Sequence, residues 1–322
     1  MEVTGVRVVT LTVNPALDVA VTVEAMVPEH KMHAVASRRD PGGGGVNVSR
    51  ALRRLGVASE ALIVAGGPIG DELVALVEAE GVAVSRIANP HMTRESIAVR
   101  DASRGTQYRV VVDGPPVADV DALLDAVVTA ARGASVLVVS GNLSPTTPPR
   151  LYRDLLAAVD ADSPGMTTVV DCAGQALAEA VRSAATIVKP SRRELASLVD
   201  WTPATSGELV VAAREVLGRG AVEALAVSLG ARGAVLVERD GPATWFAPPA
   251  VDVVSTVGSG DTMVAALVAA LLDGSDLVDA VRRGVAAGTA ACLTDGTDLC
   301  HVADVERLLP LVRMETDTGR IR

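Results

Sequence analysis

Short runs of apolar and β-branched residues recur along this 322-residue chain, and stretches with the spacing of amphipathic helices separate them. A strand that reads as a nearly continuous apolar run is buried on both faces, as in a parallel sheet. The predicted strands are residues 6–13, 61–65, 135–140, 167–171, 187–189 and 224–228. The predicted helices are residues 46–55, 71–80, 118–131, 148–159, 175–182, 192–198, 208–217 and 263–272. This alternation predicts an α/β fold whose mostly parallel sheet is covered by helices on both faces.

Two segments break this rhythm, residues 18–37 and 95–112. Polar and apolar residues alternate in them, as in the stretch Glu-Ser-Ile-Ala-Val-Arg at 95–100. Such alternation is typical of strands with one exposed face. We expect the two segments to form a small β-sheet lid on a single domain of residues 1–313, followed by a polar, frayed tail of residues 314–322.

The predicted lid also bears on assembly. Short strands with one apolar face are not stable alone. Two lids packed together would bury those faces, which predicts a homodimer with two-fold symmetry.

Composition excludes several classes of partner. The net charge of −10 argues against a protein that binds nucleic acid, which needs a broad basic face. The apolar run at 263–272 is too short to cross a bilayer, and the N-terminus has no pattern of a signal peptide. Three cysteines without zinc spacing, Cys172, Cys292 and Cys300, indicate reduced thiols. We therefore expect a cytoplasmic protein that acts on a small molecule.

Four consecutive glycines precede the predicted helix at 46–55, in the stretch Pro41-Gly42-Gly43-Gly44-Gly45-Val46-Asn47-Val48. Glycines let a backbone approach a ligand closely, and a helix N-terminus offers free N–H groups. The stretch is not a dinucleotide-binding fingerprint, because Val48 occupies the third glycine position. No Gly-Lys pair exists in the chain, which excludes a P-loop.

A second motif, Ser255-Thr256-Val257-Gly258-Ser259-Gly260-Asp261-Thr262, leads into the apolar helix at 263–272. The N–H groups of Gly258, Ser259 and Gly260 would converge at the helix start and form an anion hole for a phosphoryl group. Asp261 would lie in the first turn, either as a helix cap or as a catalytic base. Two small residues followed by an aspartate at a helix start fit phosphoryl transfer.

Together the two motifs resemble those of the ribokinase-like, or PfkB, family of sugar kinases. Further stretches follow in family order, at 14–18, 140–141, 188–190, 227–230 and 284–288, so the resemblance covers nearly the whole chain. Within the family the chain is most similar to the minor-type 6-phosphofructokinases, with 1-phosphofructokinases and tagatose-6-phosphate kinases as close relatives. The resemblance implies a three-layer sandwich with a β-sheet lid and an enzyme that uses ATP and Mg²⁺.

The resemblance also implies roles for residues at matching positions. Asp261 would be the base and residues 258–260 the anion hole. The sugar phosphate would be held by Asp18, Lys31, Gly42, Gly43, Asn47, Arg94 and Asn142. The nucleotide and Mg²⁺ would lie near Lys189, Ser191, Glu194, Ser228, Gly230, Thr256 and Gly258, with Glu194 acting on the metal indirectly. A potassium ion would lie near Ser255, Val257, Ala291, Thr294 and Gly296.

Two features modify this picture. The chain has only two lysines among 29 basic residues, and both Lys31 and Lys189 fall on matched positions. Lys31 and Arg94, on the two lid segments, are expected to converge on the sugar's existing phosphate. Ser191 replaces the asparagine of the family, and Asp298 stands where related phosphofructokinases carry arginine.

These observations favour an ATP-dependent 6-phosphofructokinase. A 1-phosphofructokinase or tagatose-6-phosphate kinase is the nearest alternative. A kinase for an unphosphorylated sugar or nucleoside, or a nucleotide-binding regulator without turnover, fits less well, because the former does not need Lys31 and Arg94 and the latter does not need Asp261.

Overall fold

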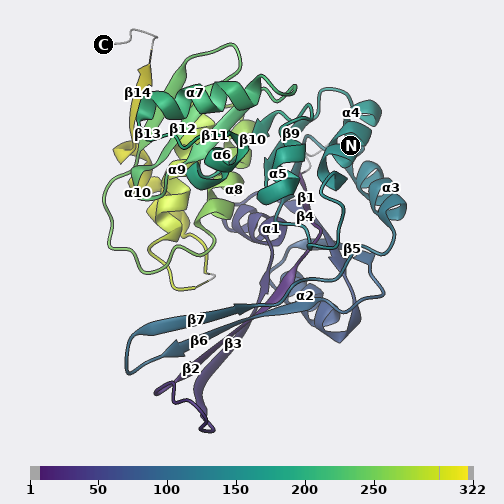
Figure 1. The fold of residues 1–322 in the computed structure, drawn as a ribbon, viewed down its shortest axis with the longest axis vertical. Coiled ribbons are helices and arrows are strands. Elements are labelled where there is room, and N and C mark those ends of the chain that lie inside the picture. The colour runs from purple at the N-terminus through teal and green to yellow at the C-terminus, as the bar shows by residue number, and fades with distance from the viewer. Residues whose placement is uncertain (1–7, 297, 318–322) are drawn as a thin grey trace.

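The computed structural model describes residues 8–296 and 298–317, which fold into an α/β body with a projecting β-sheet arm (Figure 1). The body contains a ten-stranded sheet in the order β14-β13-β12-β11-β10-β9-β8-β1-β4-β5. Its strands are β1 (Val8–Thr12), β4 (Ser59–Ala65), β5 (Ala83–Ala88), β8 (Val136–Ser140), β9 (Thr167–Asp171), β10 (Ile187–Val188), β11 (Ala224–Ser228), β12 (Ala234–Glu238), β13 (Ala243–Ala247) and β14 (Arg313–Asp317). In this order, the neighbouring strands β11, β10, β9, β8, β1, β4 and β5 all pair in parallel. Strands β12, β13 and β14 extend the sheet as antiparallel strands.

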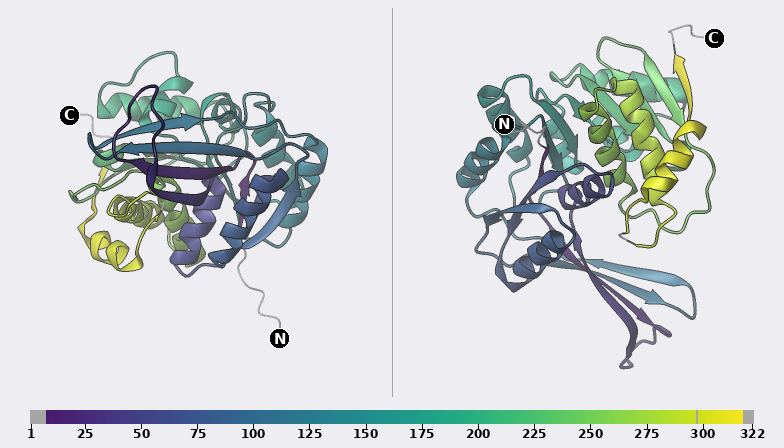
Figure 2. Two further views of the ribbon diagram at one scale, coloured as in Figure 1. Left: turned by 90° about the horizontal axis from the view of Figure 1, so that it is seen from below. Right: turned by 180° about the vertical axis from the view of Figure 1, so that it is seen from behind.

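Helices cover both faces of this sheet (Figure 2). On one face the helices are α3 (Val120–Ala131), α4 (Leu151–Asp162), α5 (Gly174–Ala180), α6 (Arg192–Leu198) and α7 (Ser206–Leu217). On the other they are α1 (Gly44–Arg54), α2 (Gly67–Ala79), α8 (Ser259–Leu272), α9 (Leu277–Ala291) and α10 (Val302–Leu308). The core is built largely from Val, Leu, Ala and Ile, since aromatic residues make up only 2% of the chain. The predicted three-layer sandwich is confirmed.

The arm is a four-stranded sheet in the order β3-β2-β6-β7, formed by β2 (Ala16–Val23), β3 (Ala34–Gly42), β6 (Arg94–Asp101) and β7 (Thr106–Val111). The central pair β2 and β6 is parallel, and the two outer pairs are antiparallel. Both predicted lid segments therefore lie side by side in one separate sheet, which projects away from the body (Figures 1 and 2). We call this sheet the lid.

One expectation is wrong. The segment predicted as a frayed tail forms, through Asp317, strand β14, which pairs with β13 from Arg313↔Ala247 to Asp317↔Ala243. Backbone pairing, which composition does not reveal, orders this polar segment. Residues 318–322 lie outside the described part of the chain. None of the helices in the described part is long and apolar enough to cross a membrane.

Candidate active site

A cavity of about 410 Å³ lies where the lid meets the carboxyl ends of the parallel strands. In open parallel sheets, ligands bind at this edge. The residues lining it come from both glycine motifs, the lid and the strand ends: Asn14, Ala16, Asp18, Gly43, Gly44, Asn47, Arg94, Ser96, Arg109, Val111, Ser140, Gly141, Asn142, Asp171, Cys172, Glu194, Val257, Gly258 and Asp261. The chain thus brings residues from positions 14 to 261 into one site.

The glycines at 42–45 lie so close to neighbouring residues of the protein that side chains there would clash. A Cβ on Gly42 would lie 2.4 Å from Oδ2 of Asp18, and one on Gly44 would lie 2.3 Å from Oγ of Ser140. Gly43 has a φ of +124°, which other residues rarely adopt. The glycines therefore let α1 begin directly against the ends of β1 and β8.

Asp261 lies in the first turn of α8 and faces this glycine-led helix. Its Oδ2 accepts a hydrogen bond of 2.9 Å from Nδ2 of Asn47. Burial, with the nearby charge of Asp171, raises the pKa of Asp261 to about 7, while the Asn47 bond and the charge of Lys189 act to lower it. A carboxylate with this pKa exchanges a proton near neutral pH.

The start of α8 has the features of an anion site. Gly258 is the N-cap, with a φ of 74°, and no side chain caps the helix. The first-turn N–H groups of a helix have no intrahelical partner and attract anions. This opening lies beside Asp261, as the sequence motif predicts.

Lys189 lies next to the start of α8, since a Cβ added to Gly260 would be 3.5 Å from its Nζ. Its Nζ is 3.0 Å from Oδ2 of Asp171, and the side chain is 6% exposed. Burial acts to lower the pKa of Lys189, but the negative charges of Asp171, Asp261 and Glu194 outweigh it and raise the pKa. Lys189 therefore keeps its positive charge next to the start of α8.

Ser191 has a local structural role. Its hydroxyl accepts a hydrogen bond from the Glu194 N–H (3.2 Å), and Oε2 of Glu194 accepts one from the Ser191 N–H (2.6 Å). This reciprocal capping box starts α6 and fixes the Glu194 carboxylate, which lines the cavity.

The remaining residues predicted for the nucleotide side lie nearby but do not line the cavity. Ser228 ends β11, Gly230 follows it, and Thr256 precedes α8. Asn142 lines the cavity, and its Oδ1 accepts a bond of 2.9 Å from the Ala173 N–H.

The lid contributes Asp18, Arg94 and Arg109 to the cavity. Arg94 is anchored by hydrogen bonds to Oδ1 of Asn14 (3.1 Å) and to the Val112 carbonyl (3.2 Å). Arg109 lies 3.9 Å from Oδ1 of Asp18. Burial raises the pKa of Asp18, against the Ser96 hydrogen bond and the two guanidinium charges.

The structure does not bring Lys31 to this cavity. Lys31 is exposed in the turn between β2 and β3, whereas Arg94 lies at the other end of the lid, where the sheet meets the body. The expected convergence of Lys31 and Arg94 is therefore not seen within one chain, because β2 and β3 carry Lys31 away from the body.

Two charged residues of the cavity, Arg109 and Asp171, were missed by the sequence analysis. Arg109 belongs to the predicted lid, where its position between Tyr108 and Val110 marks it as a polar residue on the opposite face. Asp171 ends a predicted strand, and the carboxyl ends of parallel strands are where sites lie. Both signals were present in the sequence.

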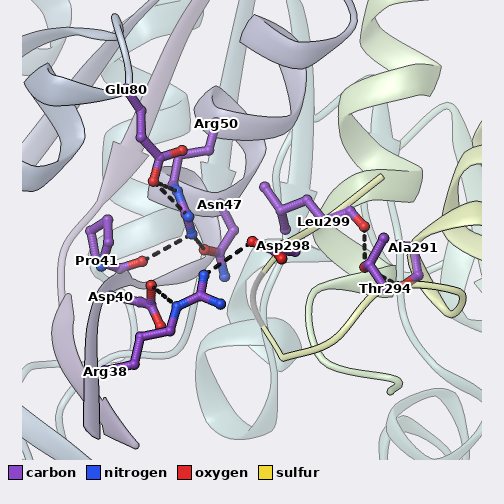
Figure 3. A network of polar contacts seen from close by, with 10 residues as sticks. All are labelled: Arg38, Asp40, Pro41, Asn47, Arg50, Glu80, Ala291, Thr294, Asp298 and Leu299. Carbon is purple, nitrogen blue, oxygen red and sulfur yellow. Dashed lines mark hydrogen bonds and ion pairs between the residues drawn. The ribbon is translucent and has the colours of Figure 1, made fainter. Parts of the chain in front are cut away.

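The residues predicted for potassium come from two neighbouring loops. Ser255 and Val257 precede α8, while Ala291, Thr294 and Gly296 follow or end α9. The loops are joined by the Val254 N–H, which donates to the Cys292 carbonyl at 2.8 Å. Thr294 Oγ1 also donates to the Ala291 carbonyl at 2.9 Å, and Asp298 pairs with Arg38 of the lid at 3.1 Å (Figure 3).

Comparison with known proteins agrees with this geometry. The model of the pfkB family of carbohydrate kinases matches residues 11–303. The chain belongs to this family. It is a kinase that transfers a phosphoryl group to an alcohol, as the two glycine motifs indicated.

Individual family members are similar over nearly their whole length. The chain is 39% identical to the ATP-dependent 6-phosphofructokinase isozyme 2 of Mycobacterium tuberculosis, over 98% of this chain and 92% of that protein. The structure resembles Escherichia coli phosphofructokinase-2 in complex with potassium (TM-score 0.89, 35% identity) and with fructose 6-phosphate (TM-score 0.86, 34% identity). Each comparison covers 95% of this chain and 99% of the other.

Proposed function

We propose that this protein is an ATP-dependent 6-phosphofructokinase, which converts fructose 6-phosphate and ATP to fructose 1,6-bisphosphate and ADP. The observation that carries the proposal is that Arg94 and Arg109 line the same cavity as Asp261. Two guanidinium groups suit a phosphate that the sugar already carries, since arginine binds phosphate bidentately. The similarity to 6-phosphofructokinases agrees with this assignment.

In the proposed reaction Asp261 accepts the proton of the sugar's 1-hydroxyl while that oxygen attacks the γ-phosphorus of ATP. The bond from the γ-phosphorus to the bridging oxygen breaks, and ADP leaves with its electron pair. The transition state is loose, so positioning and electrostatics supply most of the rate enhancement. Asp18, Gly42, Gly43, Asn47 and Asn142 would orient the sugar.

The nucleotide side would be formed by the start of α8 and the adjacent strand ends. No side chain caps the N–H groups at 258–260, which would bind a transferring phosphoryl group. The Ser259 N–H donates a long hydrogen bond of 3.4 Å to the Thr256 carbonyl, which the phosphoryl oxygen would replace. Lys189 would stabilise its charge, and Ser228, Gly230 and Thr256 would flank the nucleotide. Mg²⁺ bound with ATP would neutralise phosphate charge. Glu194, whose carboxylate is fixed by the Ser191 N–H, would orient a water molecule that binds this metal ion.

A potassium ion beside the anion hole is a further part of the proposal. The loops that carry Ser255, Val257, Ala291, Thr294 and Gly296 would supply carbonyl and hydroxyl oxygens to such an ion. Activity should rise when potassium replaces tetramethylammonium at equal ionic strength. An equal rate in the two salts would argue against the ion.

We also propose a homodimer formed through the lid, in the cytoplasm where ATP and sugar phosphates occur. The face of the lid away from the cavity is apolar on three of its strands, because the strand register aligns Val19, Ile97 and Val110 in one row and Val21, Val99 and Tyr108 in the next. The fourth strand, β3, adds Arg39 and Ser37 at the edge of these rows. Val110 is 56% exposed. Lys31 would contact a phosphate only in the cavity of the second copy.

The test of the main proposal is an ADP-release assay with fructose 6-phosphate, fructose 1-phosphate, tagatose 6-phosphate, fructose and ribose. Losing one partner of an enclosed charged contact costs about 2–5 kcal/mol. Fructose 6-phosphate should therefore exceed fructose in kcat/KM by roughly 30-fold to several thousand-fold. A higher value for fructose 1-phosphate or tagatose 6-phosphate would reassign the substrate. Equal turnover of ribose would reject sugar-phosphate specificity.

A further inference from the structure

Arg50 is a buried cation outside the cavity. It lies in α1, its side chain is 1% exposed, and it is not among the cavity-lining residues. A buried charge is costly unless it is paired and hydrogen-bonded. The contacts that justify this cost therefore indicate what the side chain does.

Three groups receive the hydrogen bonds of Arg50 (Figure 3). Nε and Nη2 both point to Oε1 of Glu80, at 2.8 and 2.7 Å. Nη1 donates to the Pro41 carbonyl at 3.2 Å and to Oδ1 of Asn47 at 3.3 Å. Glu80, at the end of α2, thus holds one side of the guanidinium while the other side faces the glycine motif.

This arrangement decides how the Asn47 amide is turned. A guanidinium has only donors, so it requires the amide oxygen. The amide NH₂ is then left facing the carboxylate of Asp261, which has only acceptors when ionised. The opposite orientation would place NH₂ against a donor and oxygen against a carboxylate, losing both hydrogen bonds.

We propose that Arg50 is a positioning residue for phosphoryl transfer, which acts through Asn47 to hold the carboxylate of Asp261 in place as a proton acceptor. The proposal rests on the proposed function in that Asp261 is taken as the base. Because Arg50 does not line the cavity, it would contact neither substrate. Its effect should therefore appear in kcat and its pH dependence and should depend on Asn47.

A double-mutant cycle tests this dependence. Arg50→Met should lower kcat about tenfold while the KM for ATP changes less than twofold, and Arg50→Lys should recover part of the loss. Arg50→Met combined with Asn47→Ala should be no slower than Asn47→Ala alone, because coupled residues are not additive. Arg53→Met, exposed on the same helix, is the control and should keep wild-type kcat. If the loss of kcat in the double mutant equals the product of the losses in the two single mutants, the proposal is overturned.

A measurement without substrate separates this proposal from the assignment of fructose 6-phosphate. The stabilisation produced by Asp261→Asn, measured by urea unfolding across pH, reports the pKa of Asp261. The same measurement is repeated in an Arg50→Met background, or in Glu80→Gln if Arg50→Met does not fold. The pH midpoint of the stabilisation should move up by roughly half to one pH unit, because the Asn47 hydrogen bond that lowers the pKa of Asp261 is lost. An unmoved midpoint would overturn the role of Arg50, whichever sugar the enzyme uses.

Discussion

Nδ2 of Asn47 lies 2.9 Å from Oδ2 of Asp261, so the helix that follows the four glycines is bonded to the helix that follows the Gly-Ser-Gly motif. Each motif carries one half of this contact, more than 200 residues apart in sequence. The relative position of the two helices therefore determines both the environment of Asp261 and the shape of the cavity.

The first prediction concerns Asp261 as the base. With a pKa of about 7, Asp261 is protonated in acid and cannot accept a proton there. The kcat/KM for the sugar should fall about tenfold per pH unit below pH 7 and level off above it. Asp261→Asn should lower kcat by roughly 10²–10⁴ at pH 8 with little change in ATP binding. A mutant with near-normal kcat would show that Asp261 is not the base.

The same raised pKa has a consequence for stability. Below about pH 4 Asp261 is protonated in both folded and unfolded chains and its ionisation affects neither. Between pH 4 and 7 the unfolded chain releases the proton and the folded chain retains it, so stability falls as pH rises. Asp261→Asn should therefore stabilise the protein by about 2–4 kcal/mol at pH 8, the lower figure allowing for water in the cavity, and by almost nothing at pH 4. Urea unfolding at both pH values measures the difference, and equal effects would contradict the raised pKa.

The order of elements through β11, apart from β5, and the two glycine motifs could be predicted because each is a local pattern. Strands β5, β12 and β13 and helices α9 and α10 were not among the predicted elements. The strands predicted at 167–171 and 224–228 have the same bounds as β9 and β11 in the structure. Asp261 directly follows the Gly-Ser-Gly motif. The position of Lys31 could not be predicted, because residue type does not show how far a hairpin extends. Nor could β14, whose polar residues are ordered by pairing with β13. The reason for the glycines at 42–45 also needed the structure, which shows what their missing side chains would meet.

The two arginines that the lid contributes to the cavity, Arg94 and Arg109, provide a test of substrate recognition. Arg94→Ala and Arg109→Ala should each lower kcat/KM for fructose 6-phosphate by roughly 30-fold or more, with little effect on the slow reaction with fructose. Arg104→Ala is a matched control, because Arg104 is exposed on the same lid and does not line the cavity. Equal losses with fructose and fructose 6-phosphate would mean that these arginines shape the lid and do not bind the phosphate.

The apolar outer face of the lid predicts the assembly. Val110→Asp places a charge in the row that Val19 and Ile97 share, so it should convert a dimer into a monomer at micromolar concentration in sedimentation. Val211→Asp, an equally exposed position on α7, should leave the dimer intact. Lys31→Ala should reduce activity in the dimer and have no further effect on the Val110→Asp protein. A wild-type protein that sediments as a monomer would refute the lid interface.

The last prediction concerns how α8 is held in place. A Cβ on Gly288 of α9 would lie 3.0 Å from the Ser259 carbonyl, at the start of α8, and that contact is with backbone. Gly288→Ala should therefore push the helix start, and with it Asp261, by a few tenths of an ångström. Because misplacement of a reacting group by about 1 Å costs about 10²-fold in rate, we expect kcat to fall several-fold.

A matched glycine separates this displacement from ordinary helix propensity. Gly207 lies in α7, and a Cβ added there would meet no atom within 4 Å, so Gly207→Ala should keep kcat and be neutral or slightly stabilising. The two variants are compared by kcat at saturating substrates and by urea unfolding. If Gly288→Ala loses stability but keeps kcat, α8 relaxes around the new methyl group, and close packing of α9 against Ser259 is not what positions Asp261.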